Sequence, residues 1–224
     1  MNNHNSKTIK LSRFQFISIF LTVVFIIALF ILGGLLSIFS YNRYKKVKIV
    51  ALGDSITAGY GIGKEKSYVG HLNKMMGLNI INAGVSGNTI SDAKLRLEKE
   101  VFYENPDVVI VLLGGNDLLY NVPPVIFFNF LSSLIDKIQN QGIKVILIGI
   151  SQNFFPEYEN QFKKIAEEKK VAGYVPNIVG GIAWRKELMY DKIHPNSEGQ
   201  KLMAMKIAPI LRKVLQEIIN SKNQ

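Results

Sequence analysis

The chain has 224 residues, enough for one ordinary domain and an appendage. Its 27 basic residues outweigh 17 acidic ones, which gives a formal net charge of +10. Part of that excess lies in residues 1–46, which contain no acid, so the charge is more typical of a membrane surface than of a nucleic-acid partner. Cysteine is absent, which excludes disulfides, thiolate metal sites and a cysteine nucleophile.

A long apolar segment follows the short basic stretch of residues 1–13. Residues 14–42 carry no charge, and residues 16–39 are almost wholly apolar. About 24 helical residues rise roughly 36 Å, more than the roughly 30 Å of a bilayer's hydrocarbon core. We therefore predict a transmembrane anchor over residues 14–42. A buried helix of a soluble domain is excluded by the length and by the lack of a polar stripe.

A cleaved signal peptide is the competing interpretation of this segment. Its apolar region is normally about 7 to 15 residues long and precedes small residues at the cleavage site. Here the apolar run is longer, and residues 37–40 (Ser-Ile-Phe-Ser) match such a site poorly. We therefore expect an uncleaved single-pass anchor in the inner or plasma membrane. Basic residues flank both ends almost equally, and we favour an extracytoplasmic catalytic domain.

Beyond the anchor, short apolar runs alternate with longer amphipathic stretches. This pattern predicts strands at 47–52, 78–82, 107–113, 143–150 and 171–178, and helices at 67–76, 90–103, 124–141, 156–170 and 196–220. Strands that are apolar throughout are typical of parallel sheets buried on both faces. We therefore predict one three-layer α/β/α domain over residues 46–220, whose ligands lie at the carboxyl ends of the strands.

Four polar motifs follow predicted strands or precede the last helix. They are Gly53-Asp54-Ser55-Ile56, the segment 82–88 (Asn-Ala-Gly-Val-Ser-Gly-Asn), Gly114-Gly115-Asn116-Asp117, and Asp191-Lys192-Ile193-His194-Pro195. Of the three histidines, His4 precedes the anchor and His71 falls inside a predicted helix. His194 alone sits in a loop with a carboxylate close by in the sequence.

These motifs contain the parts of an acyl-transfer site. A serine hydroxyl needs a base, and an imidazole oriented by a carboxylate is the usual one, so we predict Ser55 as nucleophile with His194 and Asp191. The oxyanion of the intermediate needs donors, which the backbone amides of Ser55 and Gly87 and the side chain of Asn116 can supply.

Each motif also has a structural interpretation. Gly-Asp-Ser is common in turns, Gly114-Gly115-Asn116-Asp117 can be a turn after a buried strand, and the Asp191–His194 segment can be a helix cap. We assign Asp54 and Asp117 to local hydrogen bonding in loops. Three glycines follow the first predicted strand, Gly59, Gly61 and Gly63. They lack the spacing of a dinucleotide or phosphate loop, so a nucleotide site is not expected. The four motifs in this order favour the hydrolase.

Together the four motifs resemble the four blocks of the SGNH (GDSL-type) hydrolase family. Segments 53–61 and 82–89 are most similar to its bacterial thioesterase I, arylesterase and lysophospholipase L1 branch, and the resemblance runs from about residue 47 to 215. It implies a flavodoxin-like sheet of five parallel strands and no metal or cofactor. For the site it implies the nucleophile Ser55, the oxyanion donors Gly87 and Asn116, and the pair Asp191 and His194. The Gly-x-Ser-x-Gly elbow of α/β-hydrolases is absent.

The expected substrate is an acyl ester, a thioester or a lysophospholipid, and the expected protein is a monomer. Apolar residues near the predicted site suit an acyl pocket and equally suit packing: Leu118, Leu119, Val122, Phe154 and Phe155. An O-acetyl esterase acting on a cell-surface glycan is the first alternative function. A membrane-tethered binding module that has lost activity is the second.

Overall fold

The computed structural model describes residues 13–44, 46–150 and 156–222. The chain divides into a unit of residues 1–42 and a compact unit of residues 43–224. The first described helix, α1 (Arg13–Tyr44), has 32 residues. Its segment Arg13–Gly33 is long and apolar enough to cross a membrane, as a signal sequence also can be.

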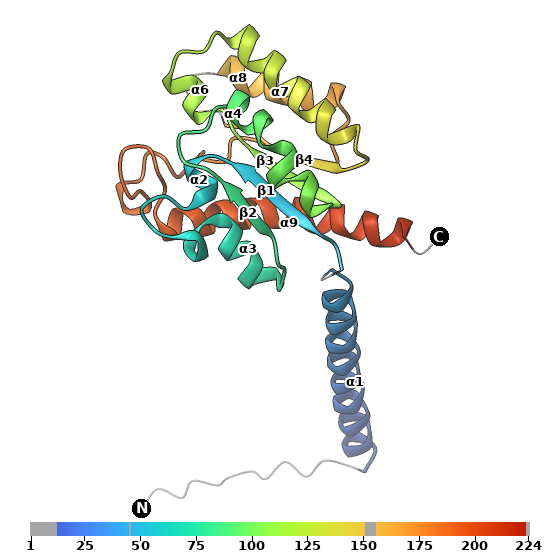
Figure 1. The fold of residues 1–224 in the computed structure, drawn as a ribbon. Coiled ribbons are helices and arrows are strands. Elements are labelled where there is room, and N and C mark those ends of the chain that lie inside the picture. Colours follow the sequence, from blue (N-terminus) through green and yellow to red (C-terminus); the bar gives the residue numbers. More distant parts are fainter. Residues whose placement is uncertain (1–12, 45, 151–155, 223–224) are drawn as a thin grey trace, which may run out of the picture. The chain divides into compact units, whose positions relative to one another are not determined.

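The second unit is built on one five-stranded sheet (Figure 1). The strands are β1 (Ile49–Gly53), β2 (Ile81–Gly84), β3 (Val108–Leu112), β4 (Lys144–Ile148) and β5 (Gly173–Val175). Their order is β2-β1-β3-β4-β5, and every neighbouring pair is parallel. This is the flavodoxin-like order, so the predicted fold class is confirmed.

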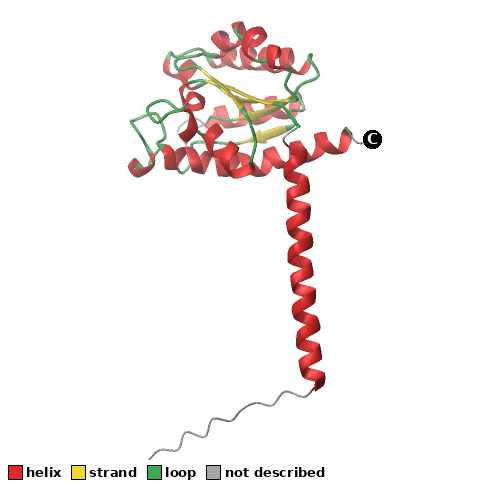
Figure 2. Ribbon diagram, turned by 60° about the horizontal axis from the view of Figure 1, so that its bottom comes forward, coloured by secondary structure: helices red, strands yellow, loops and turns green. Residues whose placement is uncertain are grey.

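Helices cover both faces of the sheet, as Figure 2 shows. One face packs against α3 (Tyr68–Met76) and α9 (Ser197–Ser221). The other face packs against α4 (Ile90–Leu95), α5 (Leu97–Glu100), α7 (Pro124–Gln139) and α8 (Pro156–Glu168). Successive strand residues alternate between the two cores: Ile49 and Ala51 face the first, and Val50 and Leu52 the second.

Two predicted elements differ from the structure in their bounds or continuity. Strand β2 begins at Ile81 rather than at residue 78, because the Asn73 side chain bonds both the N–H and the C=O of Ile80. The predicted helix 90–103 is broken at Arg96, which ends α4 and precedes α5 and the short 3₁₀ helix η2 (Phe102–Glu104).

Two differences concern short elements. Strand β5 is shorter than predicted and ends before Pro176, which has no N–H to donate to a neighbouring strand. Sequence patterns did not predict two short helices that directly follow strands, α2 (Ser55–Ala58) and α6 (Gly115–Leu119). Two 3₁₀ helices were also not predicted, η1 (Lys64–Lys66) and η3 (Lys186–Leu188).

The parallel strands bring three of the four motifs to one edge of the sheet. Gly53 at the end of β1 lies in register with Gly84 of β2 and with Leu112 of β3. The residues that follow these three positions therefore emerge side by side, as expected for the ligand-binding edge of such a sheet.

Candidate active site

Ser55 begins helix α2 directly after β1. Asp54 caps this helix by accepting a hydrogen bond from the Ile56 amide at 3.0 Å. Gly53 must be glycine, because a Cβ there would lie 1.9 Å from Thr57 Oγ1 and 2.8 Å from the Leu112 carbonyl oxygen. The tight strand-to-helix turn fixes Ser55, whose residue surface is only 9 % exposed.

Ser55, His194 and Asp191 form one hydrogen-bonded chain. His194 Nε2 lies 2.9 Å from Ser55 Oγ, and His194 Nδ1 lies 2.8 Å from Asp191 Oδ2. A carboxylate only accepts, so Nδ1 carries the proton and Nε2 is left to accept from the serine hydroxyl. This tautomer is the one that can take a proton from Ser55.

Backbone amides hold the Asp191 carboxylate in place. Its Oδ1 accepts from the amides of Ile193 and His194, each at 2.7 Å. Desolvation works to raise the pKa of the Asp191 carboxyl, but the hydrogen bonds from His194 and Ile193 outweigh it and lower the pKa overall. On the other side the Tyr60 ring packs against the imidazole, with ring centroids 4.6 Å apart. The His194 ring is therefore held from two sides.

The three predicted oxyanion donors come from three neighbouring loops. Ser55 supplies the first N–H of α2, a position without an intrahelical partner. Gly87 has φ of 84°, which favours glycine, and a Cβ there would meet no atom within 4 Å. Asn116 Nδ2 donates to the Asn88 carbonyl at 2.9 Å, which fixes the orientation of its side-chain amide and leaves its second N–H for another acceptor.

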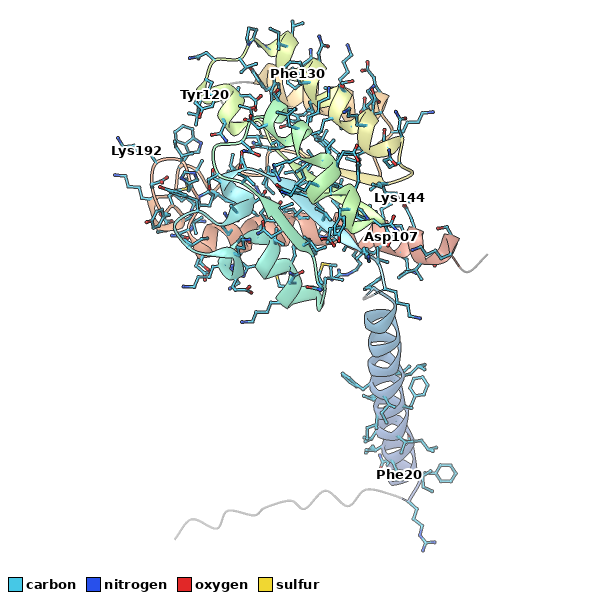
Figure 3. The ribbon with its side chains drawn as sticks, viewed as in Figure 1. Phe20, Asp107, Tyr120, Phe130, Lys144 and Lys192 are labelled. Atoms are coloured by element: carbon cyan, nitrogen blue, oxygen red, sulfur yellow. The ribbon has the colours of Figure 1, made fainter. Side chains whose placement is uncertain are left out.

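A cavity of about 530 Å³ opens beside the hydrogen-bonded residues Ser55 and His194. Ser55, Asn116 and His194 all line it, as does Lys192, which Figure 3 labels. Most of its wall is apolar, and the apolar lining residues are Ile56, Leu118, Leu119, Val122, Pro123, Pro124, Ile150, Tyr158, Val179 and Ile193. Leu118, Leu119 and Val122, which from the sequence suit either an acyl pocket or packing, line this cavity, and Leu118 and Val122 also pack against the second core. Phe154 and Phe155 lie outside the described residues.

Two buried carboxyl groups lie close to the site. Asp54 bonds locally, as predicted, whereas Asp117 accepts from the distant Ile90 amide at 3.1 Å, so its bond is not local. Burial raises the pKa of both groups, and for Asp54 it raises it to about 6. The nearby Asp117 charge adds to the increase at Asp54, while Ile56 and His194 oppose it.

Replacing Asp54 with asparagine is expected to stabilise the domain at pH 8. Its folded-state pKa of about 6 exceeds the ordinary 3.8, so the stability that this group contributes is complete below pH 3.8 and is lost as the pH rises through 6. Asparagine stays neutral and can still accept from Ile56. We expect thermal unfolding to show a gain of up to about 3 kcal/mol at pH 8 and almost none at pH 3.5.

Asp92→Asn is the matched control for this titration. The Thr89 hydroxyl lowers the pKa of Asp92, so this carboxylate contributes stability above its ordinary pKa and loses it in acid. Its replacement should therefore destabilise the domain at pH 8. A gain for Asp54→Asn that is equally large at both pH values would contradict the titration as its cause.

Several residues that hold the site together had no role predicted from the sequence, although Asn82 begins one of the four motifs. Asn82 Nδ2 donates to the Thr57 carbonyl, and Gln200 Nε2 donates to that of Ile56, so both hold α2. Arg96 bonds the Gly53 carbonyl just before the nucleophile.

The third histidine and a metal site are separate questions. His71 Nε2 lies 3.0 Å from the Ser197 carbonyl oxygen and is not part of the hydrogen-bonded chain from Ser55 to Asp191. Within the described ranges no group of three His, Cys, Asp or Glu side chains could hold a metal.

A family model and several known proteins match most of the chain. The model of the GDSL-like Lipase/Acylhydrolase family matches residues 51–202. The arylesterase of Vibrio mimicus is 31 % identical over 180 residues, covering 75 % of this chain and 90 % of that protein. Thioesterase 1/protease 1/lysophospholipase L1 of Escherichia coli K12 is 28 % identical over 181 residues, covering 77 % and 85 %.

Solved structures agree with the sequence relatives. The crystal structure of TesA matches with a TM-score of 0.68 and 30 % identity, covering 75 % of this chain and 99 % of that one. An acetyl xylan esterase, AlAXEase, matches with a TM-score of 0.62 and 26 % identity, covering 72 % and 98 %. The chain therefore belongs to the GDSL-like lipase/acylhydrolase family. It is an enzyme of the esterase and thioesterase class found in that family.

Proposed function

We propose that the protein hydrolyses acyl esters or thioesters through an acyl-enzyme on Ser55. Ser55 Oγ attacks the acyl carbonyl carbon while His194 Nε2 takes the hydroxyl proton, and Asp191 stabilises the imidazolium that forms. The observation that carries this proposal is the continuous chain of hydrogen bonds from Ser55 through His194 to Asp191, at 2.9 and 2.8 Å.

Attack converts the carbonyl oxygen to an oxyanion. The amides of Ser55 and Gly87 and the Asn116 side chain are the proposed donors to it. Asn116 lines the same cavity as Ser55, and its bond to Asn88 orients the amide beside the Gly87 loop. Preorganised donors of this kind stabilise charge in the transition state more than in the ground state.

Collapse of the intermediate breaks the bond from the acyl carbon to the leaving oxygen or sulfur. The His194 imidazolium returns its proton to that atom, which departs as an alcohol or a thiol. A water molecule then gives its proton to His194 and attacks the acyl-enzyme. Ser55 leaves and recovers the proton, which releases the carboxylic acid and restores the starting state.

The cavity favours an acyl group with an apolar chain. Its volume of about 530 Å³ is far larger than an acetyl group needs and falls within the usual range for small-molecule sites. The apolar lining begins beside Ser55 with Ile56 and continues along Leu118 and Leu119. Burial of a chain there gains roughly 0.8 kcal/mol per methylene. We therefore propose medium-chain acyl esters, thioesters or lysophospholipids as substrates.

An O-acetyl esterase acting on a surface glycan is the second candidate. The similarity to an acetyl xylan esterase structure over 72 % of this chain favours it. The two candidates differ in the acyl group that they accept, because an acetyl ester leaves most of the apolar wall without contacts.

A p-nitrophenyl ester series from acetyl to palmitoyl tests this function, with an acetylated xylo-oligosaccharide as a further substrate. We expect kcat/KM of the full chain in detergent to rise from acetyl to a medium-chain optimum. A maximum at acetyl, with turnover of the oligosaccharide, would favour the O-acetyl esterase. Folded protein that turns over no ester would favour the binding module.

We also propose that α1 is an uncleaved anchor and that the catalytic domain is extracytoplasmic. The apolar segment Arg13–Gly33 supports a membrane span. Intact mass measurement of the membrane-bound protein should therefore give the full chain, and external protease should digest the domain in spheroplasts. A shortened mature chain or a shielded domain would contradict the respective half of this proposal.

A further inference from the structure

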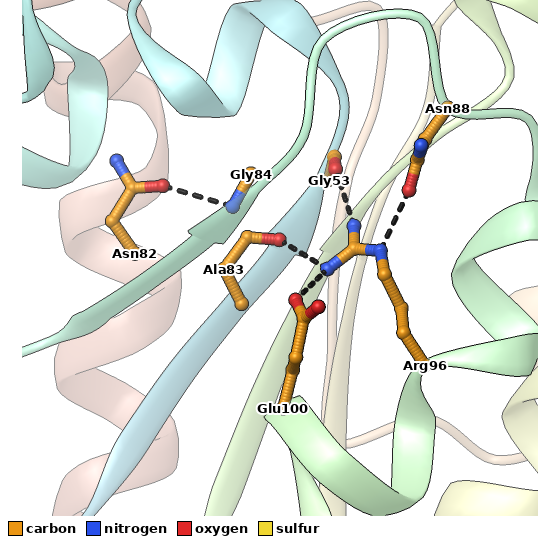
Figure 4. A network of polar contacts seen from close by, with 7 residues as sticks. All are labelled: Gly53, Asn82, Ala83, Gly84, Asn88, Arg96 and Glu100. Carbon is orange, nitrogen blue, oxygen red and sulfur yellow. Dashed lines mark hydrogen bonds and ion pairs between the residues drawn. The ribbon is translucent and has the colours of Figure 1, made fainter.

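Arg96 lies where α4 ends and α5 begins, and its guanidinium bonds four groups (Figure 4). Its Nη2 donates to the Gly53 carbonyl at 2.9 Å, and its Nη1 to the Ala83 carbonyl at 2.8 Å and to Glu100 at 2.6 Å. Its Nε donates to Asn88 Oδ1 at 2.6 Å. The side chain is 12 % exposed, so this charge is largely removed from water.

Three of these four acceptors, Gly53, Ala83 and Asn88, belong to the segments that carry the proposed oxyanion donors. Gly53 is two residues before Ser55, and Asn88 directly follows Gly87. The carbonyl of the same Asn88 accepts from Asn116 Nδ2 at 2.9 Å. Arg96 therefore joins the loop of each backbone donor directly, and it joins the side-chain donor through Asn88.

The chemistry of the contacts requires an arginine. A buried cation is costly unless it is fully hydrogen-bonded, and Glu100 balances its charge from a more exposed position. The planar guanidinium presents several donors in a fixed fork, so it can hold two carbonyls and an amide at once. A lysine ammonium is a compact point charge on a flexible stem and cannot reproduce the fork.

We propose that Arg96 is a positioning residue for the oxyanion hole, acting through Gly53 and Asn88. This inference rests on the proposed function and deepens it. Oxyanion donors must lie about 2.7–3.1 Å from the developing charge, so a small shift of the Gly87 loop weakens their effect. None of these four hydrogen bonds is to Ser55, His194 or Asp191, so the proton-transfer chain is left intact when Arg96 changes.

Arg96→Lys and Arg96→Ala test this role in the full chain, with steady-state kinetics on the best p-nitrophenyl ester. We expect kcat to fall about 10- to 100-fold with KM within about twofold, because only transition-state stabilisation is lost. Binding of a phenylboronic acid, whose serine adduct places an oxygen in the oxyanion hole, should weaken by a similar factor. Lys94→Ala is the matched control, since Lys94 lies on α4, two residues before Arg96, and bonds Ser133 instead.

A double-mutant cycle separates positioning from general support of the fold. Asn88→Ala removes the side-chain acceptor of Arg96 but keeps the carbonyl that binds Asn116. If Arg96 acts through Asn88, the fold-loss of kcat in the double variant will be smaller than the product of the fold-losses in Arg96→Lys and Asn88→Ala. Asn88→Ala also provides a test if Arg96→Ala does not fold.

The inference is overturned if folded Arg96→Lys keeps wild-type kcat and wild-type boronate affinity. It is also overturned if the two mutations multiply independently, or if KM rises while kcat stays unchanged. Its failure is distinct from failure of the proposed function, in which the wild-type chain itself turns over no ester.

Discussion

Replacing Ser55 with alanine is expected to lower kcat for ester hydrolysis by about 10⁴-fold or more. The hydroxyl that would form the acyl-enzyme is lost, while the backbone amide of residue 55 remains available as an oxyanion donor. Alanine is a good helix former and fits the first position of α2, so the fold should be retained. KM should change little, because the cavity wall that binds the acyl chain is unaltered.

The assay is steady-state turnover of the best p-nitrophenyl ester by the full chain in detergent, with circular dichroism as the test of folding. Ser133→Ala is the matched control, because this serine on α7 accepts a hydrogen bond from Lys94 and is not among the residues that line the cavity. Folded Ser55→Ala protein with a kcat within about tenfold of wild type would exclude Ser55 as the nucleophile.

His194→Ala is expected to lower kcat by about 10³- to 10⁴-fold, because general-base assistance to the serine is lost. The histidine ring also bonds the Asp191 carboxylate, with Nδ1 at 2.8 Å from Oδ2. Its removal leaves a space at the wall of the cavity, next to the Tyr60 ring. Added imidazole should therefore restore part of the lost rate.

His71→Ala is the matched control for His194→Ala. His71 bonds the Ser197 carbonyl and is not part of the hydrogen-bonded chain to Ser55, so its replacement should leave kcat within about twofold. Equal losses of rate in the two variants, or wild-type activity in folded His194→Ala, would contradict the assignment of His194 as the base.

Much of the fold was predictable because its signals are local. Strands such as β3 are apolar throughout, and the helix from residue 196 has an asparagine cap, so both were located to within about two residues. The wrong start of β2 has a side-chain cause, since Asn73 of α3 takes the backbone hydrogen bonds of Ile80, seven residues later. Such an interaction leaves no periodic signal in the sequence.

The candidate site was predictable where its residues are close in sequence or follow strands. The spacing of Asp191 and His194 allows the carboxylate to bond both the ring and the backbone of the histidine. The positions of Ser55 and Asn116 followed from parallel topology. Arg96 and Tyr60 could not be found this way, because an arginine in a helical stretch and a tyrosine in a loop have many ordinary roles. Their importance depends on contacts between segments distant in the chain.

Covalent labelling with a fluorophosphonate, followed by peptide mass spectrometry, tests the assignment of the nucleophile and its base together. The reagent is applied to the full-length chain, to His194→Ala and to His71→Ala for the same short time. We expect a single phosphonyl adduct on Ser55 in the wild type and in His71→Ala, and almost none in His194→Ala. An adduct on a different residue, or no adduct on Ser55 in protein that hydrolyses esters, would contradict an acyl-enzyme mechanism at this site.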